Sequence, residues 1–415
     1  MRSLGFGLGF NRHKILGGVV PLLDTYTGAS AAYSLRNLSS STTNVVRVRR
    51  SSNDDEQDFT ASEVSGGALA TFVGAGNDGF VTTWYDQVPI EELSSAYGTS
   101  ITGTVFGSTD QFTDVAPVSS GNFYRIQWTV SAIQTRGRVR FRNASNGSNI
   151  NVLAGQGNLS YFTENGVYTT FVASDAGVSL NFLGDSGQGF TYSNVSVVEI
   201  DRIPNDAIQT SASAQPKIVD SGSVVQENGK PTIDFDGTND FLEIESSNSS
   251  FNFLHNGTSC SLYAVTKRIQ TTSTISLLGN NAGAGSKIGY GMFYYANDSL
   301  LSYITRGATG AAVENLSASG QDIEVQHLIF DNIDADNSTA SNRSILNISG
   351  GVDIKNNTLT NSPSTSNATH NMQIGASGSD GNNWYGNIQE FVIFNVSKSS
   401  NQSAIENNIT SHYSI

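Results

Sequence analysis

The sequence predicts an all-β protein, built as a sandwich or a barrel. Short hydrophobic runs are separated by Gly-, Ser- and Asn-rich stretches, and long helical periodicity is nearly absent. Only 14% of the residues are charged, below the ~25% that is usual in soluble domains. Because 415 residues suffice for two or three domains of roughly 100–200 residues each, we expect more than one sandwich.

The charge is unevenly distributed along the chain. The net charge of −14 argues against general nucleic-acid binding as the main role. Residues 1–50 nevertheless carry seven basic side chains and one acid, a net +6. We interpret residues 1–25, with Arg2, Arg12 and Lys14, as a basic Gly-rich arm that docks on an acidic partner; the alternative is a solvated face with a loose terminus. The stretch does not resemble a signal peptide, and no 18-residue apolar run predicts a membrane span.

Residues 26–87 are expected to form the first part of a sandwich. In "VVRVRR", Val46 and Val48 alternate with arginines, which predicts a half-buried strand. A short helix in "SGGALATFV" precedes a strand that ends in "TTWYDQ", with Trp84 in the core. Asp86 in this stretch indicates a turn, but "VPIEEL" follows and brings no Gly or Asn. The expected turn is therefore interrupted.

Residues 88–204 predict a second sandwich, with strands at roughly 8–12 residue spacing. "NFYRIQWTVSAI" alternates cleanly, and Trp128 is expected in the core. One face of this strand holds Tyr124, Ile126, Trp128 and Val130, and the other holds Arg125, Gln127 and Thr129. "RGRVRFRN" places Val139 and Phe141 inside and a comb of arginines outside, at 136, 138, 140 and 142.

Residues 205–415 return to the first pattern, with many short strands and polar turns. The lone cysteine, Cys260, lies among strand-like residues and is expected to be a buried apolar side chain. Near the end, Ile405 and Ile409 stand at i and i+4 behind Ser and Asn capping candidates. This spacing predicts one short C-terminal helix packed on a sheet.

The interrupted turn carries a family resemblance. "FVGAGNDGFVTTWYDQ" and "NDAIQTSASAQPKIV…ENGKPTIDFDGTNDFL" resemble the concanavalin A-like (LamG-type) jelly-roll domain of phage virion proteins. That domain is similar to the catalytic domain of family 54 α-L-arabinofuranosidases. Its members usually follow Tyr-Asp-Gln directly with Ser-Gly-Asn-Gly-Asn and Ala-x-Gln. Here the two halves are Asp86-Gln87 and 205–209, so the resemblance covers about 26–87 and 205–415.

The resemblance implies that 88–204 is an insertion, similar in style to the jelly rolls of carbohydrate-binding modules. It also implies a test for catalysis, because a retaining glycosidase needs a nucleophile and an acid/base. The position matching the family's nucleophilic Glu is Ala296, and Asp380 is the acid/base candidate. Since a methyl group cannot act as a nucleophile, we expect no glycoside hydrolase activity.

Two polar clusters are candidate sites. Aromatic faces stack on sugars, so we expect a glycan-binding groove in "GASGSDGNNWYGN"; the alternative is that its Trp closes the sandwich edge. The residues of this predicted groove are Trp384, Tyr385, Asp380, Tyr294 and Tyr295. "DFDGTND" offers oxygen ligands for Ca²⁺, but self-capping of a turn is the favoured interpretation. Its residues are Asp234, Asp236, Asn239 and Asp240. No other metal site and no cofactor is predicted.

These features favour a non-enzymatic structural protein of a phage virion, as a tail, fibre, spike or capsid-decoration component. The protein would be assembled in the host cytoplasm and exposed on the particle surface. The arm would dock on other virion proteins, and the sandwiches would face outward toward host cell-surface polysaccharide. A homo-oligomer is expected, although no heptad repeat enforces one. The alternatives are a glycan-degrading depolymerase or glycosidase, and a bacterial surface adhesin.

Overall fold

The structure is a computed structural model of the chain. It describes residues 20–97, 102–106, 111–112, 122–143, 148–150, 152–155, 161–174, 178–184, 189–245, 247–256, 258–269, 273–281, 287–294, 299–306, 309–317, 324–330, 344–348, 354–356, 364–379 and 381–415. The basic arm residues Arg2, Arg12 and Lys14 lie outside the described residues.

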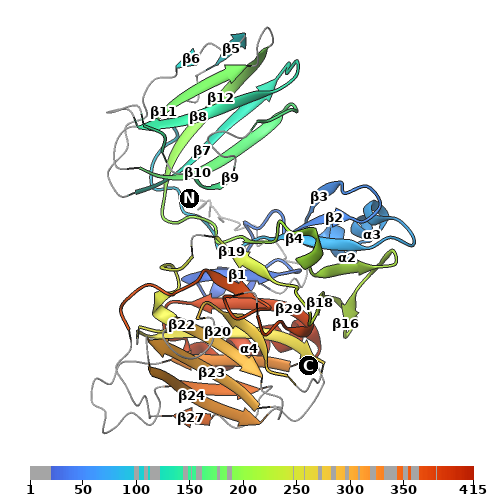
Figure 1. Ribbon diagram of the computed structural model, residues 1–415, viewed down its shortest axis with the longest axis vertical. Coiled ribbons are helices and arrows are strands. Elements are labelled where there is room, and N and C mark those ends of the chain that lie inside the picture. Colours follow the sequence, from blue (N-terminus) through green and yellow to red (C-terminus); the bar gives the residue numbers. More distant parts are fainter. Residues whose placement is uncertain are drawn as a thin grey trace, which may run out of the picture.

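Most strands belong to one large antiparallel array, drawn in the lower part of Figure 1. Its first layer is centred on β29 (Tyr385–Phe394). This strand pairs with β1 (Ala29–Ser34), β18 (Ile233–Asp236) and β20 (Cys260–Arg268). From β20 the layer continues through β25 (Glu324–Phe330), β26 (Ser344–Ile348) and β27 (Ile354–Asn356).

The second layer is built on β4 (Gly79–Trp84). On one side β4 pairs with β2 (Val46–Arg50), which pairs with β3 (Glu56–Phe59). On the other side the order is β13 (Ala207–Ile208), β19 (Leu242–Ile244), β28 (Met372–Ile374), β21 (Ile275–Gly279), β22 (Ile288–Tyr294), β23 (Ser299–Arg306) and β24 (Thr309–Ser317). Apolar side chains of both layers share one core cluster, so the array is a sandwich.

Short elements cover and connect the layers. Strand β14 (Lys217–Asp220) pairs with β4, β18 and β15 (Ser223–Val224), and a small hairpin follows in β16 (Gln226–Glu227) and β17 (Lys230–Pro231). The helices are α1 (Leu22–Thr25), α2 (Ala61–Ser65), α3 (Ala68–Val73) and α4 (Gln402–Tyr413). Single 3-10 turns are η1 (Ala212–Ala214), η2 (Asn252–Leu254) and η3 (Ser399–Asn401). No helix in the described ranges is long and apolar enough to cross a bilayer.

Strands β5 to β12 form a separate upper lobe (Figure 1). One sheet has the order β5 (Gly103–Phe106), β12 (Gly189–Ile200), β7 (Asn122–Ser131), β10 (Gly166–Ser174) and β9 (Val152–Gly155). The other has the order β6 (Gln111–Phe112), β11 (Val178–Gly184) and β8 (Gly137–Asn143). The lobe has its own core around Trp128. The predicted all-β class, with large antiparallel sheets in sandwich arrangement, is confirmed; the limits of the insertion at 88 and 204 stay a prediction.

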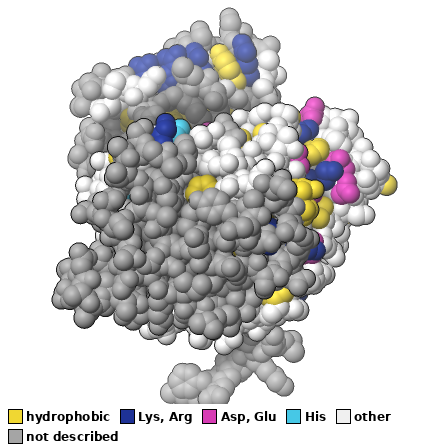
Figure 2. Space-filling view, turned by 60° about the horizontal axis from the view of Figure 1, so that its bottom comes forward, with side chains coloured by type: hydrophobic (Ala, Val, Ile, Leu, Met, Phe, Trp, Pro, Cys, Tyr) yellow, Lys and Arg dark blue, Asp and Glu magenta, His cyan; other side chains and the backbone are white. Residues whose placement is uncertain are grey.

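Period-two alternation builds this upper core as predicted. Tyr124, Ile126, Trp128 and Val130 are buried, while the residues between them are only partly so. On β8 the buried Val139 and Phe141 alternate with partly exposed arginines at 138, 140 and 142. Figure 2 shows Lys and Arg side chains gathered along this upper lobe.

Three further predictions about burial are confirmed. Trp84 lies in the core of the main sandwich with no exposed surface. Cys260 opens β20 and is likewise buried. Helix α4 packs Ile405, Ile409 and Tyr413 on β20 and β29, within a cluster that also holds Tyr263 and Phe394.

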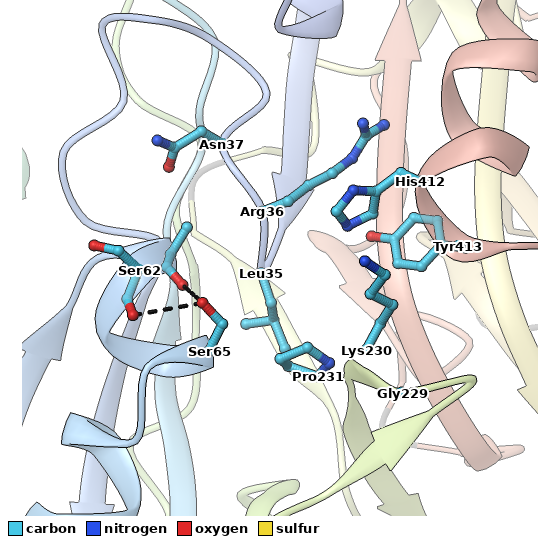
Figure 3. Close-up of a pocket in the computed structure, with 11 residues that line it drawn as sticks. Leu35, Arg36, Asn37, Ser62, Ser65, Gly229, Lys230, Pro231, His412 and Tyr413 are labelled. Carbon is cyan, nitrogen blue, oxygen red and sulfur yellow. Dashed lines mark hydrogen bonds between the residues drawn. The ribbon is translucent and has the colours of Figure 1, made fainter. Parts of the chain in front are cut away.

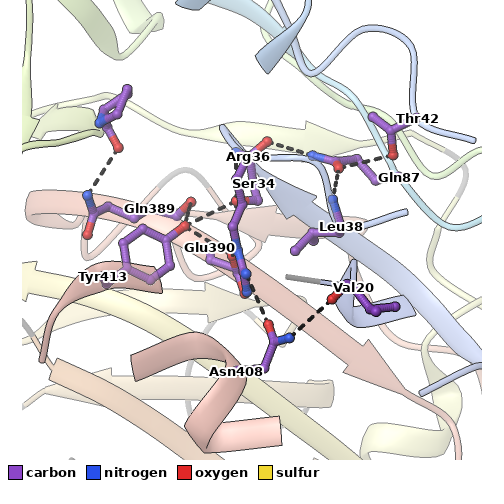
Figure 4. Close-up of polar contacts among 11 residues, drawn as sticks. Val20, Ser34, Arg36, Leu38, Thr42, Gln87, Gln389, Glu390, Asn408 and Tyr413 are labelled. Carbon is purple, nitrogen blue, oxygen red and sulfur yellow. Dashed lines mark hydrogen bonds and ion pairs between the residues drawn. The ribbon is translucent and has the colours of Figure 1, made fainter. Parts of the chain in front are cut away.

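A buried ionic network ties helix α4 to both β1 and β29 (Figure 4). Glu390, in the middle of β29, is fully buried. Its carboxylate accepts from Arg36 Nε at 2.7 Å and Arg36 Nη2 at 2.9 Å. It also accepts from Ser34 Oγ at 3.0 Å and from the hydroxyl of Tyr413 at 3.0 Å, and Arg36 Nη1 donates to Asn408 Oδ1 at 3.0 Å. The charge is thus paired and hydrogen-bonded on every side, as burial requires.

We predict that Glu390→Gln destabilises the main sandwich by about 3–5 kcal/mol, because it leaves the Arg36 charge buried without a counter-ion. Urea unfolding should show a clear loss of stability. The double variant Arg36→Met, Glu390→Gln should recover part of it. Arg47→Met, which breaks a half-exposed pair with Glu56, serves as the control and should change stability by less than about 1 kcal/mol. A double variant no more stable than Glu390→Gln would contradict this interpretation.

Candidate functional site

The predicted aromatic groove is not formed as expected, because two of its members are core residues. Trp384 and Tyr294 are each at most 1% exposed, and both belong to the core of the main sandwich. Their ring centroids are 5.8 Å apart. The backbone N–H of Trp384 donates to Gly375 O at 2.8 Å, which turns the side chain inward. The expectation that Trp384 and Tyr294 contact a glycan is therefore wrong, and the alternative of a structural Trp holds.

Tyr385 is the member of this set that remains accessible, with 37% of its surface exposed. It starts β29 opposite Asp236 and covers Gly237, where an added Cβ would lie 2.7 Å from the Cβ of Tyr385. Its role in glycan binding stays a prediction. Asp380 and Tyr295 lie outside the described residues, as does Ala296, the position matched to the nucleophile.

The acidic stretch 234–240 is a self-capped turn. Asp236 Oδ1 accepts from the backbone N–H of Thr238 at 2.7 Å, and Asp240 Oδ2 accepts from that of Asp236 at 3.0 Å. Asn239 Nδ2 donates to Ser213 O at 2.7 Å, and Asp234 Oδ1 accepts from the side chain of Asn387. These contacts agree with the capping interpretation. No group of three or more His, Cys, Asp or Glu side chains is arranged to hold a metal in the part of the chain that the structure describes.

A shallow polar groove of about 470 Å³ lies where β19 and β28 pair. We call it the strand-end groove; it is lined by Glu243, Asn248, Thr369, His370, Asn371, Gln373, Gly378 and Ser379. Leu242 and Ile244 point into the core, so Glu243 points outward, directly opposite Gln373. The Glu243 carboxylate accepts from Asn371 Nδ2 at 2.9 Å and from Gln373 Nε2 at 3.0 Å. Sequence reasoning missed these residues, because only the pairing of two distant strands brings them together.

The two halves of the interrupted Tyr-Asp-Gln motif meet at the buried carboxylate of Asp86. The Asp86 side chain has no exposed surface and forms an ion pair with Arg202. Asp86 Oδ1 accepts from the backbone N–H of Ala32 at 3.0 Å and of Val88 at 3.1 Å, and Oδ2 accepts from that of Asn205 at 3.0 Å. Arg202 also donates to the carbonyls of Val88 at 3.1 Å and Ser30 at 2.9 Å. The chain therefore leaves and re-enters the main sandwich at one fixed point.

A cleft of about 560 Å³ opens beside this point, between the main sandwich and the upper lobe. We call it the junction cleft. The main sandwich and the connecting chain contribute residues 41–44, 85–90, Pro204 and Asp206, and the upper lobe contributes Arg125, Thr169 and Phe171. Arg125 and Phe171 are direct partners in the β7–β10 ladder and face outward, while Tyr124 and Val172 face the core of the lobe. The same alternation that fills the core therefore presents this polar and aromatic surface.

The cleft contains hydrogen-bonding groups of several kinds beside two aromatic rings. The Tyr85 hydroxyl donates to Asp58 Oδ1 at 2.8 Å. Gln127 Nε2, just beyond the cleft, donates to Thr169 Oγ1 at 3.1 Å. Arg125 pairs with Glu92, and its Nε is buried without a hydrogen-bond partner among the residues that the structure describes. Tyr85 and Phe171 are both only half-buried.

Asp206 adds a carboxyl group with a raised pKa to the same cleft. Burial raises its pKa to about 7, and the nearby charges of Asp86 and Asp58 act in the same direction. A hydrogen bond from the backbone N–H of Asp86 to Asp206 Oδ1, at 2.9 Å, and the Arg202 charge oppose the shift. Near neutral pH the group is therefore partly protonated, so its carboxyl can donate as well as accept a hydrogen bond.

The comparisons with known proteins find low sequence identity and low structural similarity. No family model matches the chain, and no curated protein does. A GH54 α-L-arabinofuranosidase soaked with a cyclic sulfate inhibitor is 13% identical, over 94% of this chain and 64% of its own, with a TM-score of 0.46. The CBM40 of the Ruminococcus gnavus IT-sialidase, bound to α2,3-sialyllactose, is 12% identical over 44% of this chain and 96% of its own, with a TM-score of 0.33. At these values neither structure assigns a function, and the phage family stays a prediction.

We predict that Asp206→Asn changes how stability depends on pH. The folded-state pKa of Asp206 lies above its unfolded value of about 3.9, so its protonated form favours folding. This contribution is lost as the pH rises from about 4 through about 7. Asn stays neutral and can still accept from the Asp86 N–H. Thermal unfolding at pH 5 and pH 8 should therefore show the variant gaining relative to wild type at pH 8, and equal differences at both pH values would contradict it. Asp240, whose pKa is also raised to about 7, is present in both the wild type and the variant, so its contribution to the pH dependence cancels in the comparison.

Proposed function

We propose that the protein binds polysaccharide without cleaving it, and that the junction cleft is the binding site. The observation that carries this proposal is the joint lining of the cleft by aromatic, hydroxyl, amide and guanidinium groups from two sandwiches. Sugars present apolar C–H faces and dense hydroxyl groups. Aromatic rings can stack on the C–H faces, and neighbouring hydrogen-bond donors and acceptors can bind the hydroxyl groups.

The dimensions and pre-formed shape of the cleft support this ligand class. A volume of about 560 Å³ lies within the roughly 300–1,000 Å³ range of ligand sites, and it suits a short oligosaccharide segment. The Asp86–Arg202 pair fixes the connection between the sandwiches before any ligand arrives. Because less freedom is lost on binding, a weak set of contacts can give measurable affinity.

We further propose that this binding serves a phage particle, with the sandwiches displayed toward host surface glycans. The basic, Gly-rich arm at residues 1–25 supports this, because a cationic segment suits docking on an acidic particle protein. The missing nucleophile at Ala296 supports a binding role over a catalytic one.

The second candidate function is glycoside hydrolysis in the strand-end groove. Glu243 supplies one carboxylate there, and Ser379, the neighbour of Asp380, lines the same groove. If this candidate is correct, released sugar from a glycan panel should disappear in both Glu243→Gln and Asp380→Asn. Absence of turnover in the wild-type protein would remove it.

We predict that Phe171→Ala weakens binding of the best oligosaccharide from a glycan array by about tenfold, ~1.4 kcal/mol, because a stacking face is lost. Asn44→Ala, on the opposite wall, should also weaken it. Isothermal titration calorimetry measures both. Val167→Ala is the matched control, since Val167 lies on the same face of β10, is 69% exposed and does not line the cleft.

The possible outcomes distinguish a wrong assignment of the site from a wrong assignment of the function. Full binding by Phe171→Ala and Asn44→Ala would move the site elsewhere and leave glycan binding intact. A wild-type protein that binds nothing on a broad array would contradict the function itself.

For the virion role, we predict that mass spectrometry of purified phage particles from the source of this sequence detects the chain, with peptides from both sandwiches. Truncation of residues 1–19, which spares the buried Leu22 and Leu23 of α1, should abolish its incorporation, because the basic part of the arm is the docking segment. Particles that consistently lack the chain would contradict this role.

A further inference from the structure

A second cavity, of about 340 Å³, lies on the main sandwich and shares no lining residue with the junction cleft. Four segments far apart in the sequence form its walls (Figure 3). They are the loop after β1, helix α2, the β16–β17 hairpin and the last turn of α4. We call it the lysine cavity, after Lys230 in its wall.

Lys230 gives this cavity an uncompensated positive charge. Its ammonium forms no ion pair with any residue that the structure describes, whereas the neighbouring Arg36 is neutralised by Glu390. The base of Lys230 is held in place, because Gln389 Nε2 donates to the carbonyls of Lys230 at 3.2 Å and Pro231 at 3.1 Å. Figure 3 shows the Lys230 side chain directed toward His412 and Tyr413.

His412 experiences this positive potential. Its pKa is lowered to about 4, chiefly by burial; the charges of Arg36 and Lys230 contribute to this lowering, and the charge of Glu390 opposes it. Tyr413 is the other titratable group in this wall; helix α2 contributes Ala61, Ser62 and Ser65, which carry no charge. The imidazole is therefore neutral near pH 7, and a bound anion would favour its protonation.

The remaining walls suit a sugar ring. Asn37, Ser62 and Ser65 place an amide and two hydroxyls on the side of helix α2, where Ser65 Oγ already donates to Ala61 O at 2.9 Å and keeps lone pairs to accept. Leu35 and Pro231 supply apolar surface. A volume of about 340 Å³ lies at the small end of ligand sites and suits a single ring.

We propose that the lysine cavity binds the carboxylate-bearing ring of an acidic sugar, of the hexuronic-acid class. The carboxylate pairs with Lys230, His412 donates to it when protonated, and the amide and hydroxyl groups of Asn37 and Ser62 contact the ring hydroxyls. Among the described residues that line the cavity, Lys230 is the cation without an ion pair, and its single charge matches one carboxylate. This site is separate from the polysaccharide site of the junction cleft, and its existence does not depend on that function.

Calorimetric titration of the full chain with glucuronate, glucose and inorganic phosphate tests the proposal. Glucuronate should bind, glucose should bind at least tenfold more weakly, and affinity for glucuronate should increase as the pH falls from 7 to 5, because binding takes up a proton at His412. Lys230→Met should lose at least tenfold in affinity. Its thermal stability should stay equal or rise, since Lys230 forms no ion pair with any residue that the structure describes.

Lys217→Met is the control, because Lys217 is ion-paired with Asp78 and Asp220 and lies outside the cavity. It should bind glucuronate as the wild type does. Equal binding of glucose and glucuronate, or undiminished binding by Lys230→Met, would overturn the proposal. Phosphate binding as tight as that of glucuronate would also overturn it, because the site would then be a general anion site with no preference for a sugar acid.

Discussion

The buried carboxylate of Asp86 is the interaction on which the two-lobed structure depends. It accepts from three backbone N–H groups and pairs with Arg202, although Asp86 and Arg202 are 116 residues apart in sequence. A charge without exposed surface is tolerated only with such complete pairing. The contacts of Asp86 therefore fix the chain segments that leave and re-enter the main sandwich. The positions of these segments determine where the upper lobe lies beside the main sandwich.

The junction cleft follows from this constraint together with strand alternation. The outward face of β7 and β10 is polar and aromatic because the inward face is needed for the lobe's core. Asp86 brings this face beside Tyr85 and Asp206. Burial raises the pKa of Asp206 to about 7, and the charge of Asp86 adds to this effect, so the Asp206 carboxyl is partly protonated in the cleft near neutral pH. The contacts of Asp86 thus influence both the arrangement of the two sandwiches and the chemistry of the proposed binding site.

Features that depend on residues close together in the sequence were predicted more fully than contacts between residues far apart in it. Alternation in "NFYRIQWTV" is local, and it identified both the buried Trp128 and the outward Arg125. The broken Tyr-Asp-Gln motif identified Asp86-Gln87 and residues 205–209 as its two halves, and in the structure Asp86 accepts a hydrogen bond from the backbone of Asn205. The burial of Trp384 was misjudged because its Gly/Asn neighbours indicate a loop, while a backbone bond to Gly375 turns the ring inward. Glu243 and Gln373 were missed, since their contact depends on the pairing of strands about 130 residues apart.

The central claim is that two sandwiches, held by Asp86, form one polysaccharide site. A crystal structure of the full chain with the best-binding oligosaccharide from a glycan array tests it most directly. We predict electron density for a sugar ring between Tyr85 and Phe171, with polar contacts from both sandwiches. A junction cleft that stays empty while the sugar occupies the strand-end groove, or a sugar in the cleft that contacts only one of the two sandwiches, would contradict the account.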